Sequence, residues 1–286
     1  MSARRSPPIS IAIPASFVSG IPHLREKTVK TGIVGRSAAI FRIEEIVVYS
    51  DLPGQDQSRD ADLISSILSY METPQYLRKR LFPHKPSLRY AGVLPPLRTP
   101  HHPTTKLVRD LRSGEFREGV IVKSDRRGSY VDIGVERPAV LPRAHLPPER
   151  RVTVRIVGFH RGAPEAYLTD RDEVSIYWGY SVTVPNMTLG QLVKRGRHDL
   201  VVGTSRRGRP IVEVIQKLKK KWRRAQRVLL AFGSPNEGLR EILEHENLKL
   251  EDVAHFVVNT IPDQGTETVR TEEAIHASLA VLNLMI

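Results

Sequence analysis

The sequence predicts an α/β fold in which one parallel-sheet domain is interrupted along the chain by a small β-barrel. Apolar strands alternate with helical segments at both ends of the chain, an order typical of a parallel sheet covered by helices. Between these ends, a proline-rich segment leads into a run of short alternating strands. The expected divisions are 1–92 and 171–286 for the two parts of the sheet domain, and 93–170 for the connector and barrel.

The N-terminal part carries two strands and three helical segments. Residues 10–14 (SIAIP) and 43–49 (IEEIVVY) are rich in β-branched side chains and predict strands. Residues 24–41 have apolar residues at helical spacing, and 60–71 form an amphipathic helix whose acidic start suits the helix dipole. A further helical piece is expected at 75–82.

The amino-acid pattern changes twice in the middle of the chain. Residues 83–105 contain six prolines, which cannot lie inside regular elements, so this segment is expected to be an extended connector. Residues 119–134 then form two alternating strands around an Asp-Arg-Arg-Gly turn, and further strands follow at 138–141, 151–158 and 166–169. Five short strands in roughly fifty residues fit a small barrel.

The C-terminal part returns to strands and helices, and its strands end in polar loops. Residues 188–194 predict a short helix, and 199–203 predict a strand that ends in the loop 204–210. Two apolar strands then end at 233–238 (GSPNEG) and 259–274, where each polar loop opens a helix. Ligands of open α/β sheets bind just past the carboxyl ends of strands, so this pair predicts a small-molecule site built mainly from backbone.

The composition favours a polyanionic partner. The 286 residues include 44 Lys and Arg against 31 Asp and Glu, a net charge of +13. Such an excess points to nucleic acid, although a solvated basic surface is the simpler alternative. No apolar stretch predicts a membrane span, and the basic N-terminus lacks the apolar core of a signal peptide. The absence of cysteine excludes disulfides, and a cytoplasmic location is expected.

Four segments together resemble the SPOUT class of methyltransferases, in the branch that carries an inserted OB-like barrel. They are 35–49 (GRSAAIFRIEEIVVY), 203–208 (GTSRRG), 230–238 (LAFGSPNEG) and 259–274 (NTIPDQGTETVRTEEA). The resemblance implies a trefoil knot in the C-terminal part and S-adenosylmethionine bound, bent, against its loops. It also implies a homodimer in which N-terminal residues of one subunit approach the cofactor of the other. Because chains almost never thread themselves, the knot rests on the resemblance alone.

The resemblance places the cofactor among residues of three loops: Thr204, Arg207, Gly233, Ser234, Asn259, Thr260, Ile261, Gln264 and Thr271. Gly233 would let a ligand approach bare backbone, or would form a tight turn in which Ser234 or Asn236 caps the next helix. Thr271 is expected either to contact the ligand or to cap the last helix. Arg207 would bind a carboxylate with its planar guanidinium, or would add to a general RNA-facing charge.

Arg36 is the candidate catalytic residue. In the enzymes that the chain resembles, an arginine at this place in the first helix lies near the methyl acceptor. There it could orient the acceptor base or offset negative charge on a ring oxygen. The alternative is a helix-surface arginine. Arg42 is a weaker candidate, and Glu44 and Glu237 are conceivable general bases, although a Glu in a first helical turn usually complements the dipole.

Two basic regions are expected to contact RNA, unless they are merely solvated surface. They are the run KLKKKWRR at 217–224 and the barrel, and the expected RNA-binding residues are Lys123, Arg126, Arg127, Lys219, Lys220, Lys221, Arg223 and Arg224. Tyr130 and Phe159 are expected either to stack on bases or to fill the barrel core. His101 and His102 have no further ligands at metal spacing, so no metal site is expected.

The sequence therefore predicts a knotted parallel-sheet methyltransferase domain, discontinuous in sequence, with an inserted OB-like barrel. Its expected function is S-adenosylmethionine-dependent methylation of a base in structured RNA, with ribosomal RNA as the first expectation. By family analogy, a ring nitrogen such as that of uracil is favoured over a ribose oxygen. The alternative is a non-catalytic RNA-binding ribosome-assembly factor on the same fold. An unrelated enzyme acting on a nucleotide phosphate is disfavoured, because the sequence has no Gly-rich phosphate loop.

Overall fold

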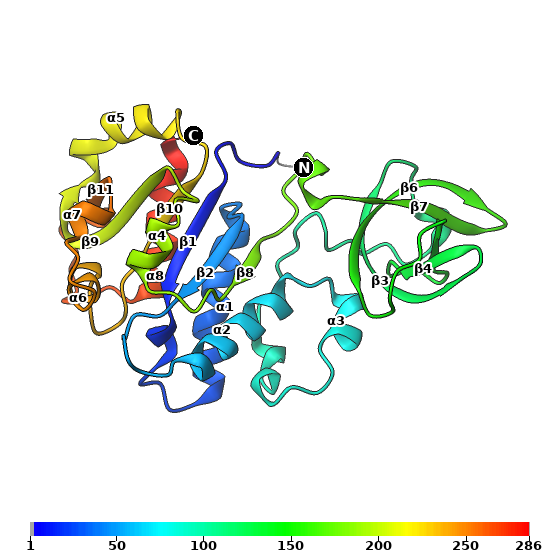
Figure 1. Cartoon of the computed structure of the whole chain (residues 1–286), viewed down its shortest axis with the longest axis horizontal. Coiled ribbons are helices and arrows are strands. Elements are labelled where there is room, and N and C mark those ends of the chain that lie inside the picture. Colours follow the sequence, from blue (N-terminus) through cyan, green and yellow to red (C-terminus); the bar gives the residue numbers. More distant parts are fainter. Residues whose placement is uncertain (1–2, 286) are drawn as a thin grey trace. The chain divides into compact units, whose positions relative to one another are not determined.

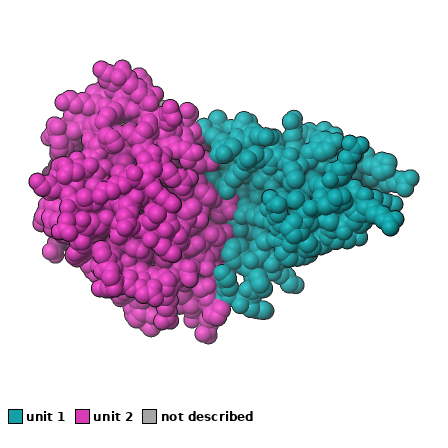
Figure 2. All heavy atoms as spheres, in the orientation of Figure 1, with its two compact units in different colours: residues 1–4, 73–85, 97–179 teal, residues 5–72, 86–96, 180–286 magenta. Residues whose placement is uncertain are grey.

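The computed structural model describes residues 3–285, which form two compact units (Figures 1 and 2). The unit that contains the barrel comprises the chain up to Arg4, Thr73–Lys85 and Leu97–Gly179. The unit that contains the sheet comprises Arg5–Glu72, Pro86–Pro96 and the chain from Tyr180 onward. Each unit is thus assembled from separate stretches of sequence.

The sheet unit is built on six parallel strands in the order β11-β9-β10-β1-β2-β8. These are β1 (Ile9–Pro14), β2 (Glu45–Tyr49), β8 (Ser181–Thr183), β9 (Leu200–Pro210), β10 (Val228–Ala231) and β11 (Phe256–Asn259). The strands β1, β2 and β10 are buried along their whole length, as expected for central strands with both faces covered. The predicted parallel sheet is confirmed.

Helices cover both faces of this sheet (Figure 1). Ala12, Val47 and Tyr49 point to one face, where they pack with apolar residues of α4 (Leu189–Lys194), α6 (Leu239–Glu244) and α7 (Leu250–Val253). Their sequence neighbours, such as Ile11 and Ile46, point to the other face because side chains alternate along a strand. That face is covered by α1 (Leu24–Ile40), α2 (Ser58–Glu72), α5 (Ile211–Trp222) and α8 (Thr271–Leu282).

Short 3-10 turns fill the connections. The predicted connector contains two of them and no longer helix or strand, as its prolines dictate. The turns of the chain are η1 (Ala15–Val18), η2 (Pro86–Leu88), η3 (Ala91–Val93), η4 (Val108–Asp110), η5 (Arg171–Glu173) and η6 (Asn283–Met285). None of the helices within residues 3–285 has both the length and the apolar content needed to cross a membrane.

The barrel unit holds five strands that close in the order β3-β4-β5-β7-β6, which confirms the predicted barrel. The strands are β3 (Phe116–Asp125), β4 (Gly128–Asp132), β5 (Ala139–Pro142), β6 (Arg151–His160) and β7 (Ala163–Thr169). Residues such as Ile121, Val131, Val154 and Ile156 fill the interior. The same unit contains α3 (Gln75–Leu81), which sequence analysis groups with the N-terminal part.

The strand β9 extends further than the sequence predicts. Residues 204–210, expected to be a loop, continue the strand to Pro210. Pairing with β11 is interrupted, however, because Gly203 lies opposite Val257 and the next paired residue is Arg209, opposite Val258. Residues 204–208 therefore bulge between two paired stretches. Gly208 lies so close to β11 that a Cβ atom there would stand 2.6 Å from the carbonyl carbon of Val258, so only glycine fits.

A buried polar chain lies at the amino ends of the strands. His198 Nε2 is 3.0 Å from Ser10 Oγ, and that hydroxyl donates to Glu45 Oε2 at 3.1 Å. Because the hydroxyl donates its only proton to the carboxylate, Nε2 must donate to the hydroxyl and Nδ1 is left as an acceptor. Nδ1 is buried and has no hydrogen-bond partner among residues 3–285. Burial lowers the pKa of His198, because it disfavours the charged ring.

Stability should therefore fall in mild acid through His198. Above about pH 6.5 the ring is neutral in both the folded and the unfolded protein. Below that pH the ring binds a proton in the unfolded protein, whereas in the folded protein it stays neutral to a lower pH. The free energy of unfolding is expected to decrease by up to about 1.4 kcal/mol per pH unit through this group. Urea unfolding at about pH 7.5 and about pH 5.5 measures the change. The His198→Gln variant keeps a donor for Ser10 and should lose this part of the dependence, and an equal dependence in both proteins would contradict the prediction.

Candidate functional site

A cavity of about 290 Å³ opens beyond the carboxyl ends of β9, β10 and β11. Its walls come from the bulge of β9, the loop that follows β10, and the loop between β11 and α8. All nine residues that the sequence predicts for the cofactor line this one cavity: Thr204, Arg207, Gly233, Ser234, Asn259, Thr260, Ile261, Gln264 and Thr271. The parallel order of the three strands brings these distant segments to the same edge of the sheet.

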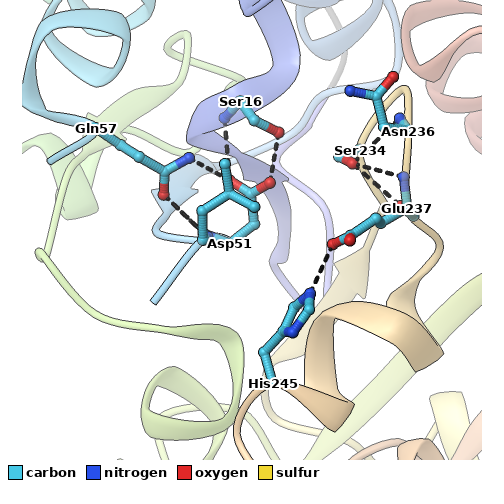
Figure 3. Close-up of polar contacts among 8 residues, drawn as sticks. Ser16, Asp51, Gln57, Ser234, Asn236, Glu237 and His245 are labelled. Carbon is cyan, nitrogen blue, oxygen red and sulfur yellow. Dashed lines mark hydrogen bonds and ion pairs between the residues drawn. The ribbon is translucent and has the colours of Figure 1, made fainter. Parts of the chain in front are cut away.

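The loop after β10 is a tight turn closed by Ser234. The Ser234 amide donates to the carbonyl oxygen of Glu237 at 2.8 Å, and Ser234 Oγ accepts from the amides of Glu237 and Asn236 at 2.9 and 3.3 Å (Figure 3). A Cβ atom on Gly233 would stand 2.9 Å from the Glu237 carbonyl oxygen, so this turn requires glycine. The predicted capping of the next helix by Ser234 or Asn236 is wrong, because the residue that caps α6 is Gly238.

Three hydroxyl groups tie the β10 end to its neighbours. Thr204 Oγ1 donates to the carbonyl oxygen of Ala231 at 3.0 Å, and the Tyr49 hydroxyl donates to that of Phe232 at 2.8 Å. Thr271 Oγ1 donates to the carbonyl oxygen of Gly233 at 3.3 Å. Thr271 is the first residue of α8 and Arg270 is its N-cap, so the predicted capping role of Thr271 is wrong. Its hydroxyl instead holds α8 against the Gly233 turn.

Side chains of the loop between β11 and α8 hold that loop in shape. Asn259 Oδ1 accepts from the amide of Ile261 at 2.9 Å, and Asn259 Nδ2 donates to the carbonyl oxygen of Arg206 at 3.0 Å. Gln264 Nε2 donates to two carbonyl oxygens of its own loop. Thr260 Oγ1 lies 2.7 Å from Ser278 Oγ on α8. The cavity is therefore formed by backbone that its own side chains hold in place, as expected of a preorganised site.

Charged side chains of both signs stand at the cavity wall. Arg207 lies 3.7 Å from Glu241 Oε1 with most of its side chain exposed, so this ion pair is weak. Glu237, the conceivable general base, has Oε2 3.0 Å from His245 Nε2 (Figure 3). The wall thus offers two carboxylates, Glu237 and Glu241, beside the two guanidinium groups of Arg206 and Arg207.

A neighbouring acidic residue is structural. Asp51, at the end of β2, accepts hydrogen bonds from the Ser16 amide at 3.0 Å, from Gln57 Nε2 at 2.9 Å, and from the Ser16 hydroxyl (Figure 3). The carboxylate is buried, and three donors satisfy it. It fixes the ends of β1 and β2 to each other and is not available for chemistry.

Arg36 is not among the residues that line the cavity. It is half-buried on α1, and its Nη1 donates to the carbonyl oxygen of Pro96 at 3.1 Å. Arg42 follows the end of α1 and has a positive φ of 55°. The predicted catalytic residue and the predicted cofactor residues are thus not brought together within one chain.

Some lining residues carry no prediction from the sequence. The most informative are Ala274 and Ser278, which follow Thr271 on α8 at a spacing of three and then four. Small residues at this spacing share one helix face, and that pattern could have indicated the wall. Glu241 lies four residues after Glu237 and could have been found in the same way. Thr268 and Val269 lie within the C-terminal motif itself.

The predicted RNA-binding residues lie in both units. In the sheet unit, Lys219, Lys220, Arg223 and Arg224 surround a shallow hollow at the end of α5, and Lys221 Nζ lies 5.9 Å from the centre of the Phe256 ring. In the barrel unit, Lys123, Arg126 and Arg127 are exposed at the β3–β4 hairpin, where Lys123 Nζ lies 4.7 Å from the centre of the Tyr130 ring. The His101–His102 pair belongs to no cluster of metal-binding side chains in the described part of the chain.

Comparisons with known proteins agree with the geometry. Residues 8–282 match the model of a family described as "Putative RNA methyltransferase". A human 28S rRNA (uridine-N(3))-methyltransferase is 33% identical over 96% of this chain and 77% of its own length. The Drosophila melanogaster protein of the same name is 31% identical over 96% of this chain and 61% of its own length. An uncharacterized protein of Halobacterium salinarum is 35% identical over 96% of this chain and 98% of its own length.

The family match covers nearly the whole described chain, and it includes both parts of the sheet unit and the barrel between them. A cavity at the strand ends, a basic surface and relatives that modify RNA all agree with a single enzyme class. The chain belongs to this family of RNA methyltransferases and is an enzyme that transfers methyl groups to RNA.

Proposed function

We propose that the cavity binds S-adenosylmethionine and that the enzyme belongs to the SPOUT class, with a knotted C-terminal part. The observation that carries the proposal is that all nine residues expected at the cofactor line one cavity. Backbone of the Gly233 turn and of residues 259–261 would hold the adenine and ribose. The carboxylates of Glu237 and Glu241 suit a ligand that carries an ammonium group and a sulfonium. When bound, this cofactor supplies an electrophilic methyl group.

The strands β9 and β11 approach each other closely at Gly208, within the proposed knot. There the bulge of β9 runs against the backbone of β11 so tightly that no side chain fits between them. Both segments border the proposed cofactor cavity, so a threaded arrangement would place the cofactor against this contact. The loops would then be held rigid without disulfides or metal.

The proposed substrate atom is N3 of a uridine in ribosomal RNA. This proposal transfers to the chain what the names of the human and Drosophila relatives state. Transfer of a methyl group to N3 requires the N3 proton to pass to a base or to water, and the negative charge left by its loss spreads to the two carbonyl oxygens of the uracil. A guanidinium beside those oxygens would stabilise that charge, which is the role proposed for Arg36.

The proposed assembly is a homodimer formed through α1. Val29, Ile33 and Ile40 are exposed by 43%, 41% and 47%, and with Arg36 they lie on one face of this helix. A second copy that covers this apolar stripe would bring Arg36 to the surface of its partner. Arg36 of one subunit would then lie at the cavity of the other subunit, although it does not line the cavity of its own chain.

The basic residues of α5 and of the β3–β4 hairpin are proposed to contact RNA phosphates. Each such contact would make RNA affinity depend on salt concentration.

Calorimetric titration with S-adenosylhomocysteine, without RNA, tests the proposal. We expect saturable binding at about one molecule per subunit, since every lining residue comes from the same chain. Binding should be lost in the Asn259→Ala variant, because Asn259 holds Ile261 and Arg206 in place. An absence of binding, with RNA binding intact, would contradict the assignment of this cavity to the cofactor.

A further inference from the structure

Large apolar side chains are exposed on the β6–β7 hairpin of the barrel. Val157, Phe159, Tyr167 and Leu168 have exposed fractions of 38%, 48%, 56% and 45%. The expectation that Phe159 fills the barrel core is therefore wrong. Exposed apolar side chains that gather on one small element mark a site of interaction.

Three of the outward-facing side chains form a row across adjacent strands. Arg155 on β6 lies opposite Phe116 on β3 and also opposite Tyr167 on β7. Directly paired residues project from the same face of a sheet, so the order across the strands is aromatic, guanidinium, aromatic. The guanidinium carbon of Arg155 lies 5.7 Å from the centre of the Phe116 ring, within cation–π distance.

The next row on the same face is already covered. There Glu118 pairs with Thr153, and Trp178 lies over them with its Nε1 donating to Glu118 Oε1 at 2.5 Å. The buried Trp178 ring meets Phe116 at a centroid distance of 6.1 Å in an edge-on arrangement. Trp178 therefore covers this face only as far as Phe116, and the neighbouring side chains of Arg155 and Tyr167 are exposed to solvent.

The charge of this open face fits an anionic partner. Arg155 forms no ion pair with any residue in the 3–285 range that the structure describes. At the end of the hairpin, Arg137 Nη1 donates to the carbonyl oxygen of Arg161 at 3.2 Å, so two further arginines lie at the hairpin turn. An apolar surface of a protein partner would bury the apolar side chains but would leave the arginine side chains without an anionic group. Unpaired RNA bases offer flat rings for the aromatics together with phosphates for the arginines.

We propose that the outer face of β3, β6 and β7 is a stacking platform for unpaired bases of the RNA substrate. Tyr167 stacks on a base, and Arg155 contributes both a stacking surface and a phosphate contact. Phe159 lies opposite Pro164, on the face of β7 that carries Ala166, and is not part of this platform. Stacking of this kind tolerates any base, so the platform selects single-stranded segments of a structured RNA rather than a sequence. The inference rests on the proposed function, since it describes how that enzyme holds its RNA.

Fluorescence anisotropy of the full chain with a labelled oligouridylate tests the platform. An oligouridylate of about 12 nucleotides is suitable, because this length lies within the site size of such barrels. Tyr167→Ala is expected to raise Kd about tenfold, whereas Tyr167→Phe should bind as the original chain does. Arg155→Gln should also reduce the slope of log K against log salt by about 0.7. Leu107→Ala removes a side chain of similar exposure (38%) on the connector of the same unit and serves as the matched control.

The outcomes separate this inference from the proposed function. Weaker binding in Tyr167→Ala, with an unchanged melting temperature and an unchanged Leu107→Ala control, supports the platform. Equal Kd values in the original chain and the Tyr167→Ala variant overturn it and leave a protein partner for this face. A complete failure of the original chain to bind the oligouridylate overturns it as well. In either case, S-adenosylhomocysteine titration still reports on the cofactor cavity independently.

Discussion

A Gly233→Val substitution is expected to abolish cofactor binding and to reduce methyl transfer by about 100-fold or more. A Cβ atom at this position would stand 2.9 Å from the carbonyl oxygen of Glu237 and 3.1 Å from the Cα of Gly238. Both are backbone atoms, so the whole turn must move to relieve the overlap. Movement of the turn displaces Ser234 and Glu237 at the cavity wall, and displacements of about 1 Å are costly for a reaction that depends on alignment.

The matched control for this substitution is Gly265→Ala. Gly265 lies in the loop between β11 and α8, yet it does not line the cavity and a Cβ atom there meets nothing within 4 Å. Calorimetry with S-adenosylhomocysteine and a methyl-transfer assay should find the control equal to the original chain. Thermal unfolding of both variants shows whether the fold is intact. Normal cofactor affinity in a folded Gly233→Val protein would contradict the assignment of the cavity.

The parallel sheet and the barrel could be predicted because local pattern and tertiary environment agree. The strands β1, β2 and β10 are continuous apolar runs, and such runs occur where both faces of a sheet are covered. In the barrel, alternation along β6 places Val152, Val154 and Ile156 inside and Arg155 outside. A pattern with a period of two specifies both the strand and its buried face.

The polar geometry at the strand ends could not be predicted in the same way. Ser234 and Thr271 look like helix caps in sequence, because cap preference depends on residue type and position alone. In the structure both hydroxyls bond to backbone that is brought near by the fold: Ser234 within its own turn, and Thr271 to Gly233 across 38 residues. The extension of β9 to Pro210 likewise depends on β11, a strand that begins about fifty residues later in the chain.

Composition alone does not predict which side chains of the β6–β7 hairpin are exposed. The sequence leaves burial of Phe159 in the core as one of two expectations, but a barrel of five short strands has room inside for only one face of each strand, and the side chain is 48% exposed. The register shift between Ile156 and Gly158 alters which residues of β6 face inward beyond that point. Sequence does not reveal such a shift, which brings Phe159 opposite Pro164, on the face of β7 that carries the buried Ala166.

Arg36→Ala is expected to lower kcat by about 100- to 1,000-fold, the usual effect of removing one group that stabilises developing negative charge. Cofactor affinity should remain unchanged, because the role proposed for Arg36 is a contact with the acceptor base and not with the cofactor. A methyl-transfer assay at saturating cofactor and RNA, together with S-adenosylhomocysteine titration, separates the two quantities. Arg36→Lys keeps the charge without the planar guanidinium and should recover only part of the rate.

A mixture of subunits tests whether Arg36 acts on the partner's cavity. If it does, an Arg36→Ala subunit paired with a Gly233→Val subunit contains one site with both an intact cavity and an intact arginine. Random pairing of equal amounts should then restore about a quarter of the original activity, because half of the dimers are mixed and each has one working site of two. Two affinity tags that isolate the mixed dimer should raise this to about half. An isolated mixed dimer with no activity would place Arg36 in the site of its own subunit, and a chain that remains monomeric in solution would refute the dimer itself.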